Sequence, residues 1–176
     1  MPQIEKHALR LCEGKVLDIG AGAGIHSLYL QEKGLDVTAL DISSGAVEAM
    51  KINGIKNAVH SDFFDFKGQK FDTLLFLMNG IGVPGRLERF PEFFEKIREL
   101  LADGGQVIFD SSDLVYMYEE EDGSYLFDLN AGYYGELEYR MDYEGEEGEP
   151  FRWIFVDYQT MAGLAEMNGF YCECLE

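Results

Sequence analysis

Apolar residues along this chain follow two periods, one typical of strands and one typical of helices. Short apolar runs bounded by glycine or acidic residues predict strands at residues 16–19, 36–40, 58–60, 71–77 and 106–110. Apolar residues at every third or fourth position predict helices at 2–12, 25–33, 91–101 and between Ser43 and Asn53. Since strands and helices alternate, we predict a doubly wound, mostly parallel α/β sheet of the Rossmann-like type.

The first helix and the last third of the chain each have a pattern of apolar residues of their own. In the first helix, the spacing of Ile4, Ala8 and Leu11 predicts one buried face. After residue 110 the pattern changes to strict alternation at 133–143 and again at 151–157, which predicts an antiparallel β-hairpin inserted near the C-terminus. A helix at 159–168 and a strand at 170–175 are predicted to follow.

The net charge of the chain limits the kinds of molecule that the protein is expected to bind. The 176 residues carry a formal net charge of −19, with 14 Lys and Arg against 33 Asp and Glu. A surface this negative repels nucleic acids and anionic membranes, and the basic residues are scattered along the sequence. No apolar run approaches the ~20 residues of a membrane span, and the first residues carry early charges without an apolar signal region. We expect a cytoplasmic protein whose three cysteines are reduced.

The stretch 16–30, VLDIGAGAGIHSLYL, predicts a strand, a tight glycine turn and the first turns of a helix. Such a turn exposes bare backbone to a ligand and directs helical N–H groups at it. The glycines run Gly-x-Gly-x-Gly, and Ile25 replaces the last glycine of the dinucleotide pattern. The stretch also contains no Lys or Arg to neutralise a phosphate. These features favour a nucleoside ligand without phosphates.

Four polar residues follow the predicted parallel strands, at the edge where ligands bind in this type of sheet. They are Asp18, Asp41, Asp62 and Asn79. Asp41 lies about 20 residues beyond the glycines, where a carboxylate can accept both hydroxyls of a ribose. An edge with this many carboxylates suits a positively charged nucleoside.

Five motifs resemble, in order and spacing, those of class I S-adenosylmethionine-dependent methyltransferases: VLDIGAGAG, VTALDIS, SDFFDF, FDTLLFLMNGIG and LLADGGQVIFDSSD. Within that superfamily the chain is similar to small bacterial members of unassigned substrate. The resemblance implies S-adenosylmethionine as the cofactor and methyl transfer to a small molecule. It also implies one domain, 1–176, with a cofactor-binding core at 15–113, an acceptor side at 114–157 and a closing helix and strand at 158–176.

The resemblance implies roles for the motif residues as well. The glycines would pass under the methionine and ribose, and Asp18 would help to hold the amino end of the methionine. Asp41 would bind the ribose hydroxyls, while Asp62 would accept from the adenine amino group. Asp62 also fits a turn-capping aspartate. The implied cofactor-binding residues are Asp18, Gly20, Ala21, Gly22, Gly24, Asp41, Ile42, Ser61, Asp62, Phe63 and Asn79.

Three residues are candidates for catalysis, although a sulfonium methyl needs a base only when the acceptor is protonated. His26 could face the pocket from the start of the helix, or be a partly exposed helix residue. Asn79 could orient the acceptor or the methionine end, or simply be a turn residue. Tyr134, in the predicted hairpin, could cover the acceptor, although tyrosine is common at half-exposed strand positions. No histidine or cysteine has metal-ligand spacing, so no metal is expected.

Two further expectations concern function and length. A domain that binds S-adenosylmethionine or S-adenosylhomocysteine without turnover is one alternative, and an NAD-dependent oxidoreductase, disfavoured by the glycine spacing, is another. The family usually has more chain before the glycine strand and after the last helix, so we hypothesise a truncated or minimal form. The oligomeric state and the acceptor atom, whether O, N or S, have no signal in the sequence.

Overall fold

The computed structural model describes residues 1–127, 132–143 and 145–175, and it forms two compact units. The first unit comprises residues 1–80 and 95–110, and the second comprises 81–94 and 111–176. Helix α4 (Phe90–Leu100) contributes residues to both units.

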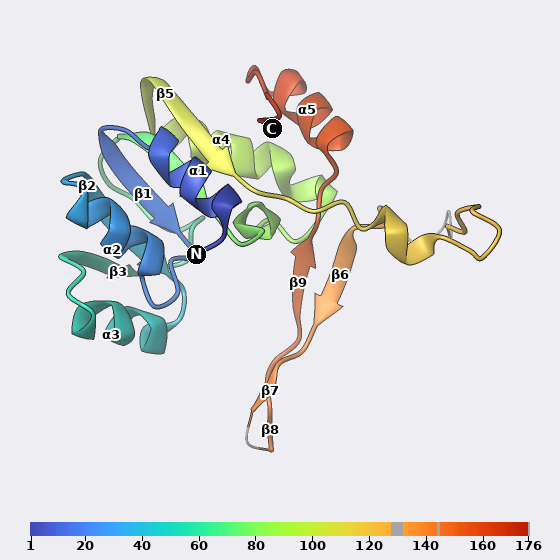
Figure 1. Cartoon of the computed structure of the whole chain (residues 1–176), viewed down its shortest axis with the longest axis horizontal. Coiled ribbons are helices and arrows are strands. Elements are labelled where there is room, and N and C mark those ends of the chain that lie inside the picture. The colour runs from blue at the N-terminus through green and yellow to red at the C-terminus, as the bar shows by residue number, and fades with distance from the viewer. Residues whose placement is uncertain (128–131, 144, 176) are drawn as a thin grey trace. The chain divides into compact units, whose positions relative to one another are not determined.

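The first unit is built on a five-stranded sheet with the order β3-β2-β1-β4-β5, in which every paired strand is parallel (Figure 1). Its strands are β1 (Lys15–Ile19), β2 (Asp36–Asp41), β3 (Asn57–His60), β4 (Phe71–Phe76) and β5 (Leu101–Phe109). The order reverses between β1 and β4, and a ligand site is expected at such a point. The predicted fold class is confirmed.

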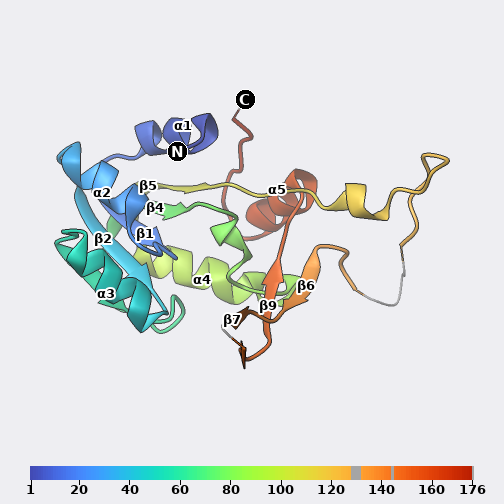
Figure 2. The same ribbon diagram turned by 60° about the horizontal axis from the view of Figure 1, so that its bottom comes forward.

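Helices cover both faces of this sheet. They are α1 (Gln3–Leu11), α2 (Ile25–Glu32), α3 (Ser44–Ile52) and the later part of α4. Buried residues of α1 and α2 pack with Val37, and those of α3 pack with Ala39. Since residues two apart in a strand point to the same face, α1, α2 and α3 share one face. Figure 2 shows α4 on the side of the sheet away from α1.

The buried centre of the sheet is strongly apolar. Val16, Leu17, Leu74, Leu75 and Phe76 are each 0% exposed. Central parallel strands are covered on both faces, and this explains why β4 reads as an unbroken apolar run. The core therefore fixes the strand ends at which the polar residues lie.

The second unit is organised around an antiparallel pair. Strands β6 (Glu136–Tyr139) and β9 (Phe151–Ile154) form its two-stranded sheet, and β7 (Asp142–Tyr143) pairs with β8 (Glu146–Glu147) near the tip. The unit also contains the 3₁₀ turns at Leu87–Arg89 and Val115–Tyr118, part of another at Gly80–Gly82, and helix α5 (Tyr158–Met167).

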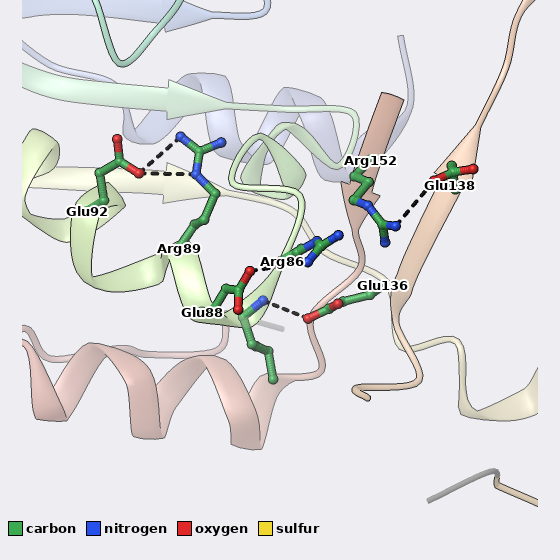
Figure 3. Close-up of polar contacts among 8 residues, drawn as sticks. Arg86, Glu88, Arg89, Glu92, Glu136, Glu138 and Arg152 are labelled. Carbon is green, nitrogen blue, oxygen red and sulfur yellow. Dashed lines mark hydrogen bonds and ion pairs between the residues drawn. The ribbon is translucent and has the colours of Figure 1, made fainter. Parts of the chain in front are cut away.

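Residues 81–89, which precede α4, contact this hairpin through a hydrogen bond and close packing. Leu87 N–H donates to Glu136 Oε1 at 2.9 Å, as the close-up in Figure 3 shows. Gly82 is also required here, because a Cβ on it would lie 2.4 Å from the carbonyl oxygen of Ile154. The predicted inserted hairpin is therefore present, and residues 81–94 are part of the same unit.

Three predicted details are wrong. Ile4 is 67% exposed, and Leu9 takes its place on the buried face of α1 at 2%. Strand β5 begins at Leu101 and not at the predicted residue 106, and its register with β4 shifts between Phe71 and Thr73. The described residues 170–175 form no strand, since the alternation of apolar and polar side chains there has no neighbouring strand to pair with.

Candidate cofactor site

The glycine loop that follows β1 is bonded to the end of β2. The N–H groups of Gly20 and Ala21 both donate to the carbonyl oxygen of Leu40, at 2.9 and 3.0 Å. The Ala21 side chain is 8% exposed and packs with Ala39 and Met50, so this residue can meet a ligand through its backbone only. The loop therefore lies at the carboxyl edge of the sheet with its course fixed on one side by β2.

Asp41, the last residue of β2, reaches across to the glycine loop. Its Oδ2 accepts the Gly22 N–H at 2.8 Å, and its Oδ1 accepts the Ser43 N–H at 2.8 Å. A carboxylate offers about four acceptor positions, so these two bonds leave capacity for two further donors. Asp41 thus organises the loop and still has the acceptor capacity that ribose hydroxyls require.

The three predicted glycines divide into two groups. A Cβ added at Gly20 or Gly22 would meet no atom within 4 Å, and both have positive φ, at 72° and 57°. A Cβ at Gly24 would lie 2.9 Å from Ile55 and 3.0 Å from Met50. Gly20 and Gly22 therefore border open space, as an approaching ligand needs, whereas Gly24 is explained by close packing between α2 and its neighbours.

Asp18 is buried at the carboxyl end of β1. It is 2% exposed, and its Oδ2 accepts the Ser27 hydroxyl at 2.6 Å. Burial raises the pKa of this carboxyl above its usual range; Asp41 raises it further, and Ser27 and His26 partly offset these effects. A ligand that brings positive charge or N–H donors to this edge would favour the ionised form of Asp18.

His26 is neither partly exposed nor without a partner. It is 5% exposed, and its Nε2 lies 3.0 Å from Oε2 of Glu5 in α1. This pair joins the first helix to the start of α2, directly after the glycine loop. The catalytic role of His26 stays a prediction, and it competes with this bond to Glu5.

The residues after β3 form a tight turn beside β2. Ser61 N–H donates to the carbonyl oxygen of Asp41, which brings the two strand ends together. Asp62 Oδ1 accepts the Phe64 N–H at 2.7 Å, so Asp62 has the turn-capping contact that was the alternative for it. Phe63 is 3% exposed and packs edge-on against Phe76. Its predicted contact with an adenine ring would therefore involve little of its surface.

Ile42 and Asn79 lie on the exposed side of this edge. The Ile42 side chain is 67% exposed, although it is apolar, and its carbonyl oxygen lies 2.8 Å from His60 Nε2. Asn79 follows β4, and its N–H donates to Asp110 Oδ1 at 2.7 Å. An exposed isoleucine at a strand end suits the predicted contact with a flat apolar ring.

Tyr134 belongs to the second unit. Its hydroxyl donates to Asp113 Oδ1 at 2.7 Å, and its ring lies 4.6 Å from that of Tyr133. Burial and then the Asp113 carboxylate raise the pKa of Tyr134 well above its usual range. The group therefore stays a neutral hydroxyl, which suits a hydrogen-bond donor better than a base.

The described residues offer neither a metal site nor a membrane-spanning helix. Among the described residues, no group of three His, Cys, Asp or Glu is arranged to hold a metal ion. None of the helices in the same part of the chain combines the length and apolar character that a bilayer crossing requires.

Sequence reasoning missed three residues that the structure brings to this edge: Glu5, Ser27 and Asp110. Each acts through another residue, namely His26, Asp18 and Asn79. Ser27 lies nine positions from its partner and Asp110 lies 31 positions from its own, so only the fold reveals these pairs. The pattern of apolar residues contains no signal for such contacts.

The sequence matches the model of a methyltransferase domain family over residues 5–175. The chain is similar over its whole length to a crystal structure of an S-adenosylmethionine-dependent methyltransferase from Bacteroides fragilis in complex with S-adenosyl-L-homocysteine. The two are 47% identical with a TM-score of 0.94, and the match covers 100% of this chain and 72% of the other. The predicted resemblance to class I S-adenosylmethionine-dependent methyltransferases is thereby confirmed.

Two curated relatives match shorter stretches. A ubiquinone biosynthesis O-methyltransferase from Pasteurella multocida is 31% identical over 80 residues, which are 44% of this chain and 33% of that protein. A 23S rRNA (uracil(747)-C(5))-methyltransferase from Pyrococcus horikoshii is 34% identical over 70 residues, which are 39% of this chain and 17% of that protein. The chain therefore matches less than half of either curated relative.

Proposed function

Because this chain belongs to the methyltransferase domain family, we propose that it binds S-adenosylmethionine and transfers the methyl group to a small-molecule acceptor. One observation carries the proposal: open space borders the backbone of Gly20 and Gly22, and the carboxylate of Asp41 accepts the Gly22 N–H beside it. A bare backbone next to a carboxylate with unused acceptor capacity fits a ribose.

The charge of the edge fits the same ligand. Asp18, Asp41 and Asp62 lie at or just beyond the carboxyl ends of the adjacent parallel strands β1, β2 and β3, and residues 16–30 contain no Lys or Arg. This favours a cationic nucleoside over a phosphate-bearing dinucleotide. S-adenosylmethionine would supply an electrophilic methyl group, because its sulfur carries a positive charge.

Methyl transfer from a sulfonium requires little chemical catalysis from the residues of the chain. Asp41 and the glycine loop would fix the nucleoside, and Asp18 would face the amino end of the methionine. The acceptor nucleophile must then be held in line for displacement, an effect that can supply roughly 7–11 kcal/mol. Asn79 and Tyr134 are the proposed orienting groups: the Tyr134 O–H donates to Asp113, and its oxygen can still accept a hydrogen bond from the acceptor molecule.

A small-molecule acceptor has two supports. The formal net charge of −19 opposes binding to the phosphates of RNA or DNA. The similarity to a ubiquinone biosynthesis O-methyltransferase agrees with it, while the similarity to an rRNA methyltransferase makes RNA the first competitor to test. We propose O, N or S as the acceptor atom and a cytoplasmic location.

The decisive experiment incubates the chain with S-adenosylmethionine and a metabolite panel and measures S-adenosylhomocysteine formation. We expect turnover with at least one small molecule and none with rRNA. Tyr134→Phe should raise KM for that acceptor and leave S-adenosylhomocysteine affinity unchanged, with Tyr139→Phe as the control. Turnover with rRNA alone would contradict the acceptor class.

The two alternatives give different results. A domain that only binds the cofactor would show S-adenosylhomocysteine affinity by calorimetry and no turnover with any acceptor. An NAD-dependent oxidoreductase would be stabilised against heat more by NAD than by S-adenosylhomocysteine at equal concentration.

A further inference from the structure

Two adjacent residues directly after β4 have an unusual backbone. Met78 and Asn79 have φ values of 58° and 59°, and no other non-glycine residue in the described ranges has a positive φ. Asparagine visits this left-handed region with some ease because its short polar side chain bonds locally, but methionine has no such compensation. Something in the fold must therefore hold this turn in place.

The holding group is Asp110, which follows the last residue of β5. Its Oδ1 accepts the Asn79 N–H at 2.7 Å, and its own N–H donates to the carbonyl oxygen of Phe76 at 3.3 Å. Asp110 thus bonds to the chain on both sides of the turn. Hydrogen bonds to a carboxylate are short and strong, so this contact can oppose the strain.

The turn lies beside the glycine loop. Strand β4 pairs with β1, with Leu75 opposite Asp18, so the two strands end at the same edge. A Cβ on Gly80 would lie 3.7 Å from the carbonyl oxygen of Ile19, which shows how closely the turn approaches the end of β1. The Met78 side chain is 73% exposed there.

We propose that Asp110 is a positioning residue for cofactor binding: it holds the turn 77–80 in the left-handed form that presents Met78 and Asn79 beside the glycine loop. The ligand class is a nucleoside that bears a sulfonium or thioether. The inference rests on one part of the proposed function, the binding of S-adenosylmethionine. It does not depend on the acceptor. A purely structural role, in which Asp110 joins β4 to β5 and does nothing else, is the competing explanation.

A variant that relieves the backbone strain at Met78 distinguishes the positioning role of Asp110 from a purely structural one. Glycine adopts a positive φ without cost, so Met78→Gly should allow the turn to form without Asp110. We would measure S-adenosylhomocysteine affinity by calorimetry and the melting temperature for wild type, Asp110→Ala, Asp110→Asn, Met78→Gly and the Met78→Gly/Asp110→Ala double variant. Asp103→Ala, exposed in the same strand, is the matched control.

We expect Asp110→Ala to weaken binding about tenfold, the effect of losing one hydrogen bond to a charged group. Asp110→Asn should lose less, because its amide oxygen still accepts. The double variant should recover at least half of the loss on a logarithmic scale, and Asp103→Ala should bind like wild type.

A lower melting temperature with wild-type affinity in Asp110→Ala, or no recovery in the double variant, would overturn the inference. If Asp110→Ala alone does not fold, a double variant that folds and binds tenfold or more below wild type overturns it equally. Absence of binding by the wild-type chain would instead overturn the proposed function itself.

Discussion

The two units of this chain are held together in different ways. In the first, five parallel strands bury side chains such as Leu17 and Leu74 completely, and the polar residues gather at one edge. In the second, an exposed ion pair between Arg152 and Glu138 links the two strands of a small sheet, rings such as Phe127 and Tyr134 contact each other beside it, and buried side chains such as Ile154 are fewer.

This difference separates two requirements of a methyltransferase. A buried parallel sheet fixes the ends of its strands, so the groups proposed to bind the cofactor have a rigid support. A small sheet with exposed contacts has less apolar surface to stabilise it, and its sequence can vary at lower cost. The difference agrees with the proposal that the first unit binds the cofactor and that residues of the second recognise the acceptor.

The core of the first unit offers the largest expected effect. Leu74 is 0% exposed in the central strand β4, so Leu74→Ala removes buried apolar surface and leaves a cavity. We expect a loss of about 2–5 kcal/mol in the free energy of unfolding, measured by urea denaturation. Ile52→Ala, at a side chain that is 85% exposed, is the control and should change it by less than about 0.5 kcal/mol. Equal losses in both would contradict the burial assigned to β4.

The next largest effect is expected at the polar edge of the sheet, the carboxyl ends of β1 and β2 where Asp18 and Asp41 lie. Asp41→Ala removes the acceptor of the Gly22 and Ser43 N–H groups, so we expect a loss of about 1–3 kcal/mol in stability. It should also weaken S-adenosylhomocysteine binding by at least about tenfold, as judged by calorimetry. Asp36→Ala, at the exposed start of the same strand, should leave the affinity unchanged. An Asp41→Ala variant with wild-type affinity would refute the proposed ribose contact.

The sequence predicts the first unit better than the second, for a physical reason. The runs that form β1 and β4 are apolar because both sheet faces are covered, and Gly34, at φ 89°, ends α2 as a glycine commonly does. These are local signals. The strand expected at 170–175 shows the same alternation as a real one but has no pairing partner, and a partner is not a local property.

The polar edge shows the same limit on a smaller scale. The positions of Asp18 and Asp41 follow from the strand ends, so the sequence places them correctly at one edge. The buried bond of His26 to Glu5 depends on how α1 packs, and the exposed Ile4 shows that the face of this helix could not be read from spacing alone. The role of each site residue toward a ligand is a further step, which the predicted variants test.

Two aspartates should respond to pH in opposite directions. Burial raises the pKa of Asp18, so its ionisation costs stability as pH rises from the unfolded-state pKa of about 4 toward the raised folded value. Asp157 begins α5; although burial raises its pKa, bonds from Thr160 and Tyr133 lower it overall. Its contribution is present above the unfolded-state pKa and is lost as pH falls through the folded one.

The matching variants make this comparison measurable by urea denaturation between about pH 2 and about pH 8, a range that includes the titration of both carboxyls. Relative to wild type, Asp18→Asn should become more stable as pH rises. Asp157→Asn should become less stable over the same change. If the two differences run parallel with pH, the contrast between the raised pKa of Asp18 and the lowered pKa of Asp157 is wrong.

The smallest effect is expected for an ion pair of the hairpin. Arg152 Nη2 lies 3.3 Å from Glu138 Oε2 across the β6–β9 pair, and the side chains are 45% and 59% exposed (Figure 3). A double-mutant cycle with alanine at both positions should give a coupling of about 0.2–1 kcal/mol, because solvent screens exposed charges. The coupling should fall toward zero in about 1 M salt, where the screening length is about 3 Å. The same cycle with Arg152 and Glu149 is the control and should show no coupling. A coupling between Arg152 and Glu138 that stays constant in salt would mean that this pair is shielded from solvent, contrary to the exposure of its side chains.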